Sequence, residues 1–115
     1  MTNLVNTTNT SWFTQLREQF EYPSNKVFSK VLLKDENVLY TLICISAGTS
    51  LSEHSTNHNA TINVIEGKGV LVLEGKEIAL ETGVFVFMPS GAQHALKSES
   101  NLAFLLIFSG NSQPS

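Results

Sequence analysis

The three histidines are the side chains of this sequence best suited to chemistry near neutral pH. They are His54, His58 and His94. An imidazole titrates near pH 6.5, serves as a general acid or base, and in its neutral form ligates divalent transition metals such as Zn, Ni, Fe or Mn. The three residues therefore predict either a polar binding site or a metal centre, if the fold brings them together.

Alternation of residues through the first two histidines predicts one face of a strand. Its members are His54, Thr56, His58, Ala60, Ile62 and Val64. We expect Ile62 and Val64 to fill the far end of a core, with His54 and Thr56 nearer its opening. His58 lies in a turn-prone Thr-Asn-His-Asn stretch, so an inward position and a surface-loop position both remain open for it.

Several classes of protein lack support in this sequence. The net charge is -3 and no block of Lys or Arg is present, so we expect no nucleic acid as a partner. The longest uninterrupted apolar runs, Val84–Met88 and Leu102–Phe108, are too short for a membrane-spanning helix. The single Cys44 cannot form an internal disulfide and is expected to pack as a small apolar residue. We therefore expect a cytoplasmic protein without a membrane partner.

The elements that must position the histidines are short strands. Apolar segments with strand character alternate with Gly- or Pro-containing turns, which predicts a single all-β barrel or sandwich domain. The expected strands are residues 27–33, 38–46, 61–66, 70–74, 77–81, 84–88, 94–97 and 102–108. We expect flexible termini over residues 1–10 and 110–115, which leaves residues 11–109 for the barrel.

One short helix is predicted before the first strand. Ser11 is a candidate cap for a helix over Trp12–Phe20, and Pro23 follows its end. Trp12, Leu16 and Phe20 are spaced by four residues and share a face, so we expect them to seal one mouth of the core.

Two segments resemble the two signature motifs of the cupin superfamily, and the chain resembles its small single-domain, cupin-2 type. The family patterns are G-x5-H-x-H-x(3,4)-E-x6-G and G-x5-P-x-G-x2-H-x3-N. The first corresponds to residues 48–67, and the second is matched at Gly83, Pro89, Gly91 and His94. The resemblance implies an all-β cupin fold, a double-stranded β-helix or jelly-roll-like barrel, with a short N-terminal helix.

The resemblance also places the metal ligands of metal-bearing cupins at His54, Thr56, Ala60 and His94. Only the two histidines are good ligands, so the metal site is degenerate, and His58 is the candidate for a third imidazole. Val84 and Ser98 stand where the family commonly has Asp and Asn. We expect each replacement to remove a polar group that anchors a loop.

Two functions follow, and the sequence leaves both open. The first is a small stand-alone cupin, a homodimer, that binds a small molecule in its barrel, and no cofactor is certain. The alternative is a metal-dependent enzyme of the oxygenase or isomerase type that uses His54, His58 and His94. A purely structural role for each histidine, as a hydrogen-bonding residue at the barrel mouth, is a further possibility. The expected pocket residues are His54, Thr56, Ile62, Val64, Met88 and His94, with walls from Val86 and from Phe104 or Leu106, and with Gln93 as a possible further polar group.

Overall fold

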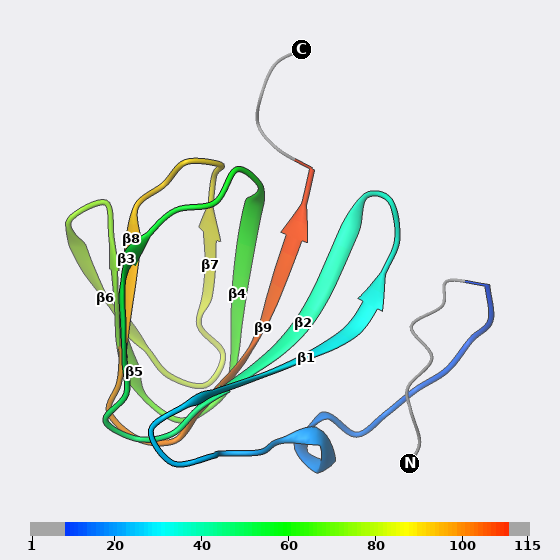
Figure 1. The fold of residues 1–115 in the computed structure, drawn as a ribbon, viewed down its shortest axis with the longest axis horizontal. Coiled ribbons are helices and arrows are strands. Elements are labelled where there is room, and N and C mark those ends of the chain that lie inside the picture. Colours follow the sequence, from blue (N-terminus) through cyan, green and yellow to red (C-terminus); the bar gives the residue numbers. More distant parts are fainter. Residues whose placement is uncertain (1–8, 111–115) are drawn as a thin grey trace.

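The computed structural model describes residues 9–110, whose regular elements are nine strands and one short helical turn (Figure 1). The strands are β1 (Val27–Lys34), β2 (Val38–Ile45), β3 (Ser50–His54), β4 (Asn59–Glu66), β5 (Gly69–Leu73), β6 (Lys76–Leu80), β7 (Phe85–Met88), β8 (His94–Ser98) and β9 (Leu102–Ser109). The all-β prediction is therefore confirmed. Most of the two termini that were predicted to be flexible, residues 1–8 and 111–115, lie outside the described residues.

The strands form two antiparallel sheets that face each other. The five-stranded sheet has the order β1-β2-β9-β4-β7, and the four-stranded sheet has the order β3-β8-β5-β6. Consecutive segments cross from one sheet to the other, as β3, β4 and β5 do, so the two layers close into a barrel (Figure 1). No helix among the described residues is long and apolar enough to cross a membrane.

The crossing from β4 to β5 depends on Gly67. This residue has a φ of 93°, in the left-handed region that favours glycine. A Cβ atom at this position would lie 1.9 Å from the backbone oxygen of Asn101, which is impossible without moving the backbone. The glycine that ends the first motif therefore permits a tight turn between the two sheets.

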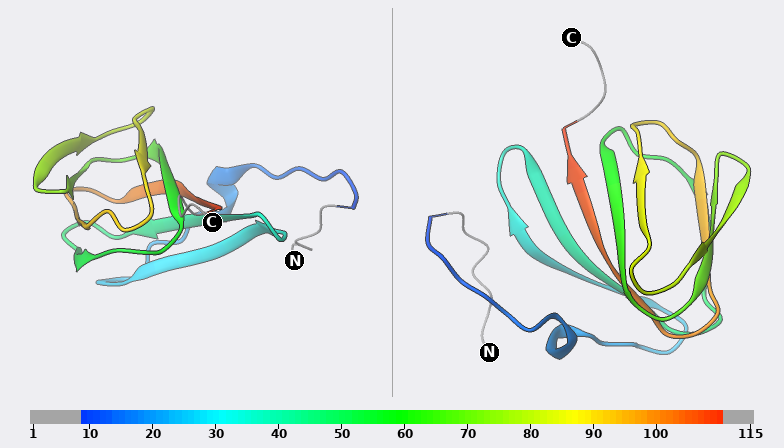
Figure 2. Two further views of the ribbon diagram at one scale, coloured as in Figure 1. Left: turned by 90° about the horizontal axis from the view of Figure 1, so that it is seen from above. Right: turned by 180° about the vertical axis from the view of Figure 1, so that it is seen from behind.

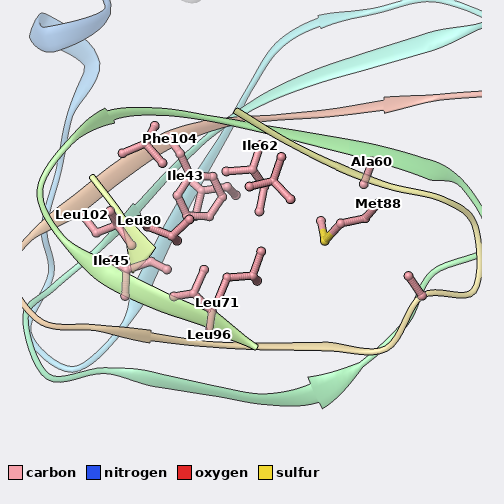
Figure 3. Packing of buried hydrophobic residues seen from close by; sticks show 13 residues of the cluster. Ile43, Ile45, Ala60, Ile62, Leu71, Leu80, Met88, Leu96, Leu102 and Phe104 are labelled. Carbon is pink, nitrogen blue, oxygen red and sulfur yellow. The ribbon is translucent and has the colours of Figure 1, made fainter. Parts of the chain in front are cut away.

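Apolar side chains from both sheets meet inside the barrel and form its main core. Ile62 and Phe104 from the five-stranded sheet face Leu71 and Leu96 from the four-stranded sheet (Figure 3). Alternation in the strands puts these residues on the inner faces, because successive side chains point to opposite sides of a sheet. This core leaves a small cavity toward one end of the barrel, which is described below.

A second apolar cluster lies on the outer face of the five-stranded sheet. Its fully or nearly buried members are Leu32, Leu42, Cys44 and Ala103, and Leu16, Phe20 and Tyr22 of the N-terminal segment pack against it. This segment runs outside the barrel before it enters β1 (Figure 2). Cys44 is thus a buried apolar residue, as expected, and its burial raises the pKa of the thiol.

The predicted N-terminal helix is much shorter in the structure. Only Leu16–Gln19 is helical, as a single 3-10 turn, and Gln15 before it is extended with a φ of -87° and a ψ of 113°. The residues that precede this turn, Trp12 to Thr14, are poor helix formers. Leu16 and Phe20 cover the outer face of the sheet and do not seal a mouth of the inner core, so this part of the sequence prediction was wrong.

Three polar side chains tie the N-terminal segment to β4. The Tyr22 hydroxyl donates a hydrogen bond of 2.7 Å to one carboxylate oxygen of Glu66, and Arg17 forms an ion pair with the other. The hydrogen bond from Tyr22 is the main reason that the pKa of Glu66 is lowered, and Arg17 acts in the same direction. Burial and the neighbouring carboxylate raise the pKa of Tyr22. We call this group the outer clasp.

Candidate functional site

A cavity of about 110 Å³ lies between the two sheets at the end of the main core. Its walls are apolar, and the only side chains lining it that can carry a charge are His54 and His94. The other lining residues are Val27, Ile43, Leu51, Ile62, Leu71, Met88, Leu96, Phe104 and Leu106. A mostly apolar hollow with a few placed polar groups is typical of a site for a small molecule.

A bulge in β3 directs His54 toward the cavity. Leu51 pairs with Leu96, and His54 pairs with His94, so three steps along β3 correspond to two along β8. The extra residue lets Leu51 and His54 both line the cavity, although regular alternation would place them on opposite faces. The Nδ1 atom of His54 lies 2.9 Å from the backbone oxygen of Ser52.

His94 begins β8, directly after the turn at residues 89–92. Its Nδ1 atom lies 3.0 Å from the backbone oxygen of Ala92. The ring centroids of His54 and His94 are 4.3 Å apart, with an angle of 61° between their planes. The two imidazoles therefore form a contacting pair at the cavity, each held by the carbonyl two residues before it.

The surroundings of His94 favour its neutral form. Burial lowers the pKa of His94, the hydrogen bond to Ala92 opposes this shift, and the nearby His54 lowers the pKa further. Within the described part of the chain, neither Nε2 atom has a hydrogen-bond partner, whereas every fully buried side-chain nitrogen or oxygen there has one. The pair thus offers two ring nitrogens that a ligand at the cavity can use.

The loops beside the histidine pair are fastened to each other. The Gly91 N–H donates to the Thr56 oxygen over 2.8 Å, and the Ser90 N–H donates to the Asn59 side chain over 3.0 Å. These bonds join the connection between β3 and β4 to the connection between β7 and β8. They hold the two histidine-bearing strand ends in a fixed relation.

Two of the six predicted pocket residues do not line the cavity, whereas His54, Ile62, Met88 and His94 do. The Thr56 hydroxyl donates to the His58 oxygen and accepts from the His58 N–H, so it stabilises the β3–β4 turn. Val64 is buried deeper in the main core, with 2% of its surface exposed. The predicted alternation fails at Thr56 because the chain leaves one sheet after His54 and joins the other at Asn59, whereas Val64 alternates with Ile62 in β4 as predicted.

His58 does not join the other two histidines. It is exposed, its ring centroid lies 6.0 Å from that of Phe108, and it lines a separate groove of about 480 Å³ beside the β1–β2 turn. No group of three His, Cys, Asp or Glu side chains within residues 9–110 is placed to hold a metal ion. Ala60 offers no donor atom, and Gln93 is exposed and does not line the cavity. The residues present therefore do not fit a tightly held metal.

Several lining residues were not predicted from the sequence. Val27, Ile43, Leu51, Leu71 and Leu96 come from five different strands. Each is an apolar residue in an alternating or apolar segment, but only the pairing of the strands shows which of them surround one space. The predicted walls Phe104 and Leu106 both line the cavity, whereas Val86 lies in the main core away from it.

Ser98 anchors a loop, contrary to our expectation that its presence would remove an anchor. Its hydroxyl donates to the Ser46 oxygen over 2.6 Å and accepts from the Thr49 N–H over 3.0 Å. The side chain is fully buried, and its hydroxyl provides hydrogen-bond partners for backbone groups of the tight turn between β2 and β3. At Val84, backbone bonds with Val64 and Glu81 fix the loop without a polar side chain.

Comparisons with known proteins agree with this architecture. The model of the cupin domain family matches residues 41–108. An uncharacterized protein of Aquifex aeolicus is 36% identical over 74 residues, which is 64% of this chain and 60% of that protein's length. A cupin superfamily protein of Desulfitobacterium hafniense is 21% identical, with a TM-score of 0.81 over 96% of this chain and 100% of the other. A cupin 2 conserved barrel domain protein of Leptotrichia buccalis is 30% identical, with a TM-score of 0.75 over 81% of this chain and 45% of the other.

Proposed function

This chain belongs to the cupin family, and we propose that it binds a small molecule in the cavity next to His54 and His94. The observation that carries the proposal is the contacting pair of imidazoles at an otherwise apolar hollow. His54 is exposed and His94 is half-buried, so a ligand in the cavity can reach both rings. Their Nε2 atoms have no hydrogen-bond partner in the described residues, which supports a role in binding.

The first test compares two substitutions on β9. Leu106 lines the cavity, whereas its neighbour Leu105 packs against the outer cluster. Leu106→Phe should fill the cavity and weaken the binding of small neutral organic molecules, measured by methyl NMR shifts of Ile62 and Met88. Leu105→Phe is the matched control and should leave binding unchanged. Equal binding by both variants, with both shown to be folded, would contradict the proposal.

The alternative, a metal-dependent enzyme, has one supporting observation, which is the pair of Nε2 atoms without protein partners. Calorimetry with Zn²⁺, Ni²⁺ and Fe²⁺ would separate the two functions. We expect weak metal binding that is unaffected by His58→Ala, because His58 lies in a different groove. Tight binding that is lost in His58→Ala would favour the enzyme and the three-histidine centre.

We also propose that two copies associate through β1. This strand lies at the edge of the five-stranded sheet, and Val27 and Val31 leave 37% and 39% of their surfaces exposed. An edge strand carries main-chain groups that can pair with the same strand of a second copy. Sedimentation at micromolar concentration should give twice the chain mass, and a single species of 12.6 kDa would contradict the dimer.

A further inference from the structure

Taking the proposed binding function as its basis, we infer a class of ligand for the cavity. The class is that of small, uncharged, mainly apolar alcohols and phenols, whose hydroxyl group donates a hydrogen bond to Nε2 of His54 or His94. Three properties of the cavity lead to this class: the hydrogen-bonding state of the rings, the absence of other charged groups from its lining, and its volume.

The backbone fixes which ring nitrogen carries the proton. A carbonyl oxygen only accepts hydrogen bonds, so the Nδ1 atoms that lie 2.9 Å from Ser52 and 3.0 Å from Ala92 must be the donors. A neutral imidazole has a single N–H, so Nε2 of each ring is left as an acceptor. The pair thus presents two acceptors and no donor, and the complementary ligand must bring the donor itself.

The lining selects against charged ligands. Apart from the two histidines, every residue around the cavity is apolar. A carboxylate or phosphate group would meet two acceptors and no N–H or O–H donor. An ammonium group would be taken out of water without a carboxylate to compensate it, which is costly. A hydroxyl group donates a hydrogen bond to one of the two acceptors without introducing a charge.

The volume limits the apolar part of the ligand. The cavity measures about 110 Å³, and an engineered apolar cavity of about 150 Å³ in another protein takes up benzene. The space therefore limits the apolar part to at most one small ring or a short branched chain. Such a body would contact Ile62, Met88 and Phe104, while its hydroxyl group reaches the histidines.

Phenol and fluorobenzene provide a matched pair of probes. They are similar in size and shape, but only phenol has a hydroxyl donor. In the full chain at pH 8, we expect methyl NMR shifts of Ile62 and Met88 with both probes and about fivefold tighter binding of phenol, as one neutral hydrogen bond would give. Phenol alone should move the ¹⁵N resonance of the unprotonated Nε2 atoms.

Variants assign the preference to the histidines. His94→Phe keeps an aromatic ring and removes one acceptor, so the preference for phenol should fall, and adding His54→Phe should abolish it. Lys97→Ala changes an exposed residue of the same strand that does not line the cavity, and should keep the preference.

The outcomes separate this inference from the function on which it rests. If both probes bind equally well to the wild-type chain, the cavity is a binding site but the hydroxyl-bearing class is wrong. If neither probe shifts the cavity methyl groups, the proposed binding function fails as well. Tighter binding of benzoate or benzylammonium than of phenol, or an Nε2–H form of both histidines in the free protein, would also overturn the inference.

Discussion

The interior of the barrel and the outer face of the five-stranded sheet each carry an apolar cluster and a small polar group, but these polar groups differ in one respect. On the outer face, Tyr22, Glu66 and Arg17 bond to one another and hold the N-terminal segment in place. Inside the barrel, His54 and His94 of the four-stranded sheet are each fixed by a backbone carbonyl and keep a ring nitrogen without a partner in the described residues.

The difference separates a structural polar group from a candidate site. In the outer clasp the donors and acceptors of neighbouring elements satisfy one another, so the hydrogen bonds serve the fold. At the histidine pair the backbone bonds orient the rings but use only one nitrogen of each. An oriented group with unused bonding capacity beside an apolar hollow is the arrangement that a ligand can complete.

The largest expected effect comes from truncating neighbouring residues of β2 that point to opposite faces. Leu42 belongs to the outer cluster and Ile43 lines the cavity. Leu42→Ala and Ile43→Ala should each lower the free energy of unfolding by about 2–5 kcal/mol, measured by urea denaturation. Only Ile43→Ala should change the affinity for phenol, measured under folded conditions. An equal change in Leu42→Ala would show that the two faces are coupled.

A smaller effect is expected at the outer clasp. Tyr22→Phe removes the hydroxyl that donates to Glu66 and should lower the free energy of unfolding by about 1 kcal/mol, with phenol binding unchanged. Arg17→Gln is the comparison, because the side chain of Arg17 is 59% exposed and surface ion pairs contribute little. A larger loss of stability in Arg17→Gln than in Tyr22→Phe would contradict this view of the clasp.

Acidification should affect the histidine pair and the outer clasp at different pH. The pKa of His94 is lowered in the folded state, so the unfolded chain takes up this proton first and stability falls as the pH drops through about 6.5. The pKa of Glu66 is also lowered, so its contribution is present above about 4.5 and is lost as the pH falls toward the folded-state pKa.

Urea denaturation as a function of pH would test this separation. Tyr22→Phe should reduce the loss of stability that occurs below about pH 4.5. His94→Phe should reduce the loss of stability that occurs near pH 6.5. If Tyr22→Phe removed the loss of stability near pH 6.5, the assignment of that loss to His94 would be wrong.

The smallest effect on stability is expected for His94→Phe. The substitution removes an imidazole whose protonated form is disfavoured by burial and keeps an aromatic ring at the cavity. We expect the free energy of unfolding at pH 8 to change by less than about 1 kcal/mol. Thermal or urea denaturation would measure the change, and a loss of several kcal/mol would mean that the histidine serves the fold.

The sequence was sufficient to predict the fold because its local signals agree. Glycines and Pro89 mark most strand breaks, and two ordered motifs specify the cupin barrel. The prediction that Trp12, Leu16 and Phe20 seal a mouth of the core failed. Their spacing of four residues indicates a shared face but not the surface that this face covers. Leu16 and Phe20 pack on the outer face of the sheet, a long-range contact that the local sequence does not specify.

The candidate site was predicted less completely. The motif positions identified His54 and His94, and the structure brings their rings together. Regular alternation does not hold through residues 55–58, where the chain passes between sheets, so Thr56 does not line the cavity and His58 takes the surface position of the two that the sequence left open. The position of the bulge and the set of strands around the cavity follow from long-range pairing, which a single sequence does not show.

The bulge in β3 also determines the electrical character of the barrel mouth. Leu51 pairs with Leu96, so in a β3 strand without the bulge Glu53, two residues further on, would pair with His94. The mouth would then combine a carboxylate with an imidazole, and the carboxylate would be a counterion for a positively charged ligand. A shift of backbone register alone, with every side chain kept, would thus convert a receptor for neutral molecules into one for cations.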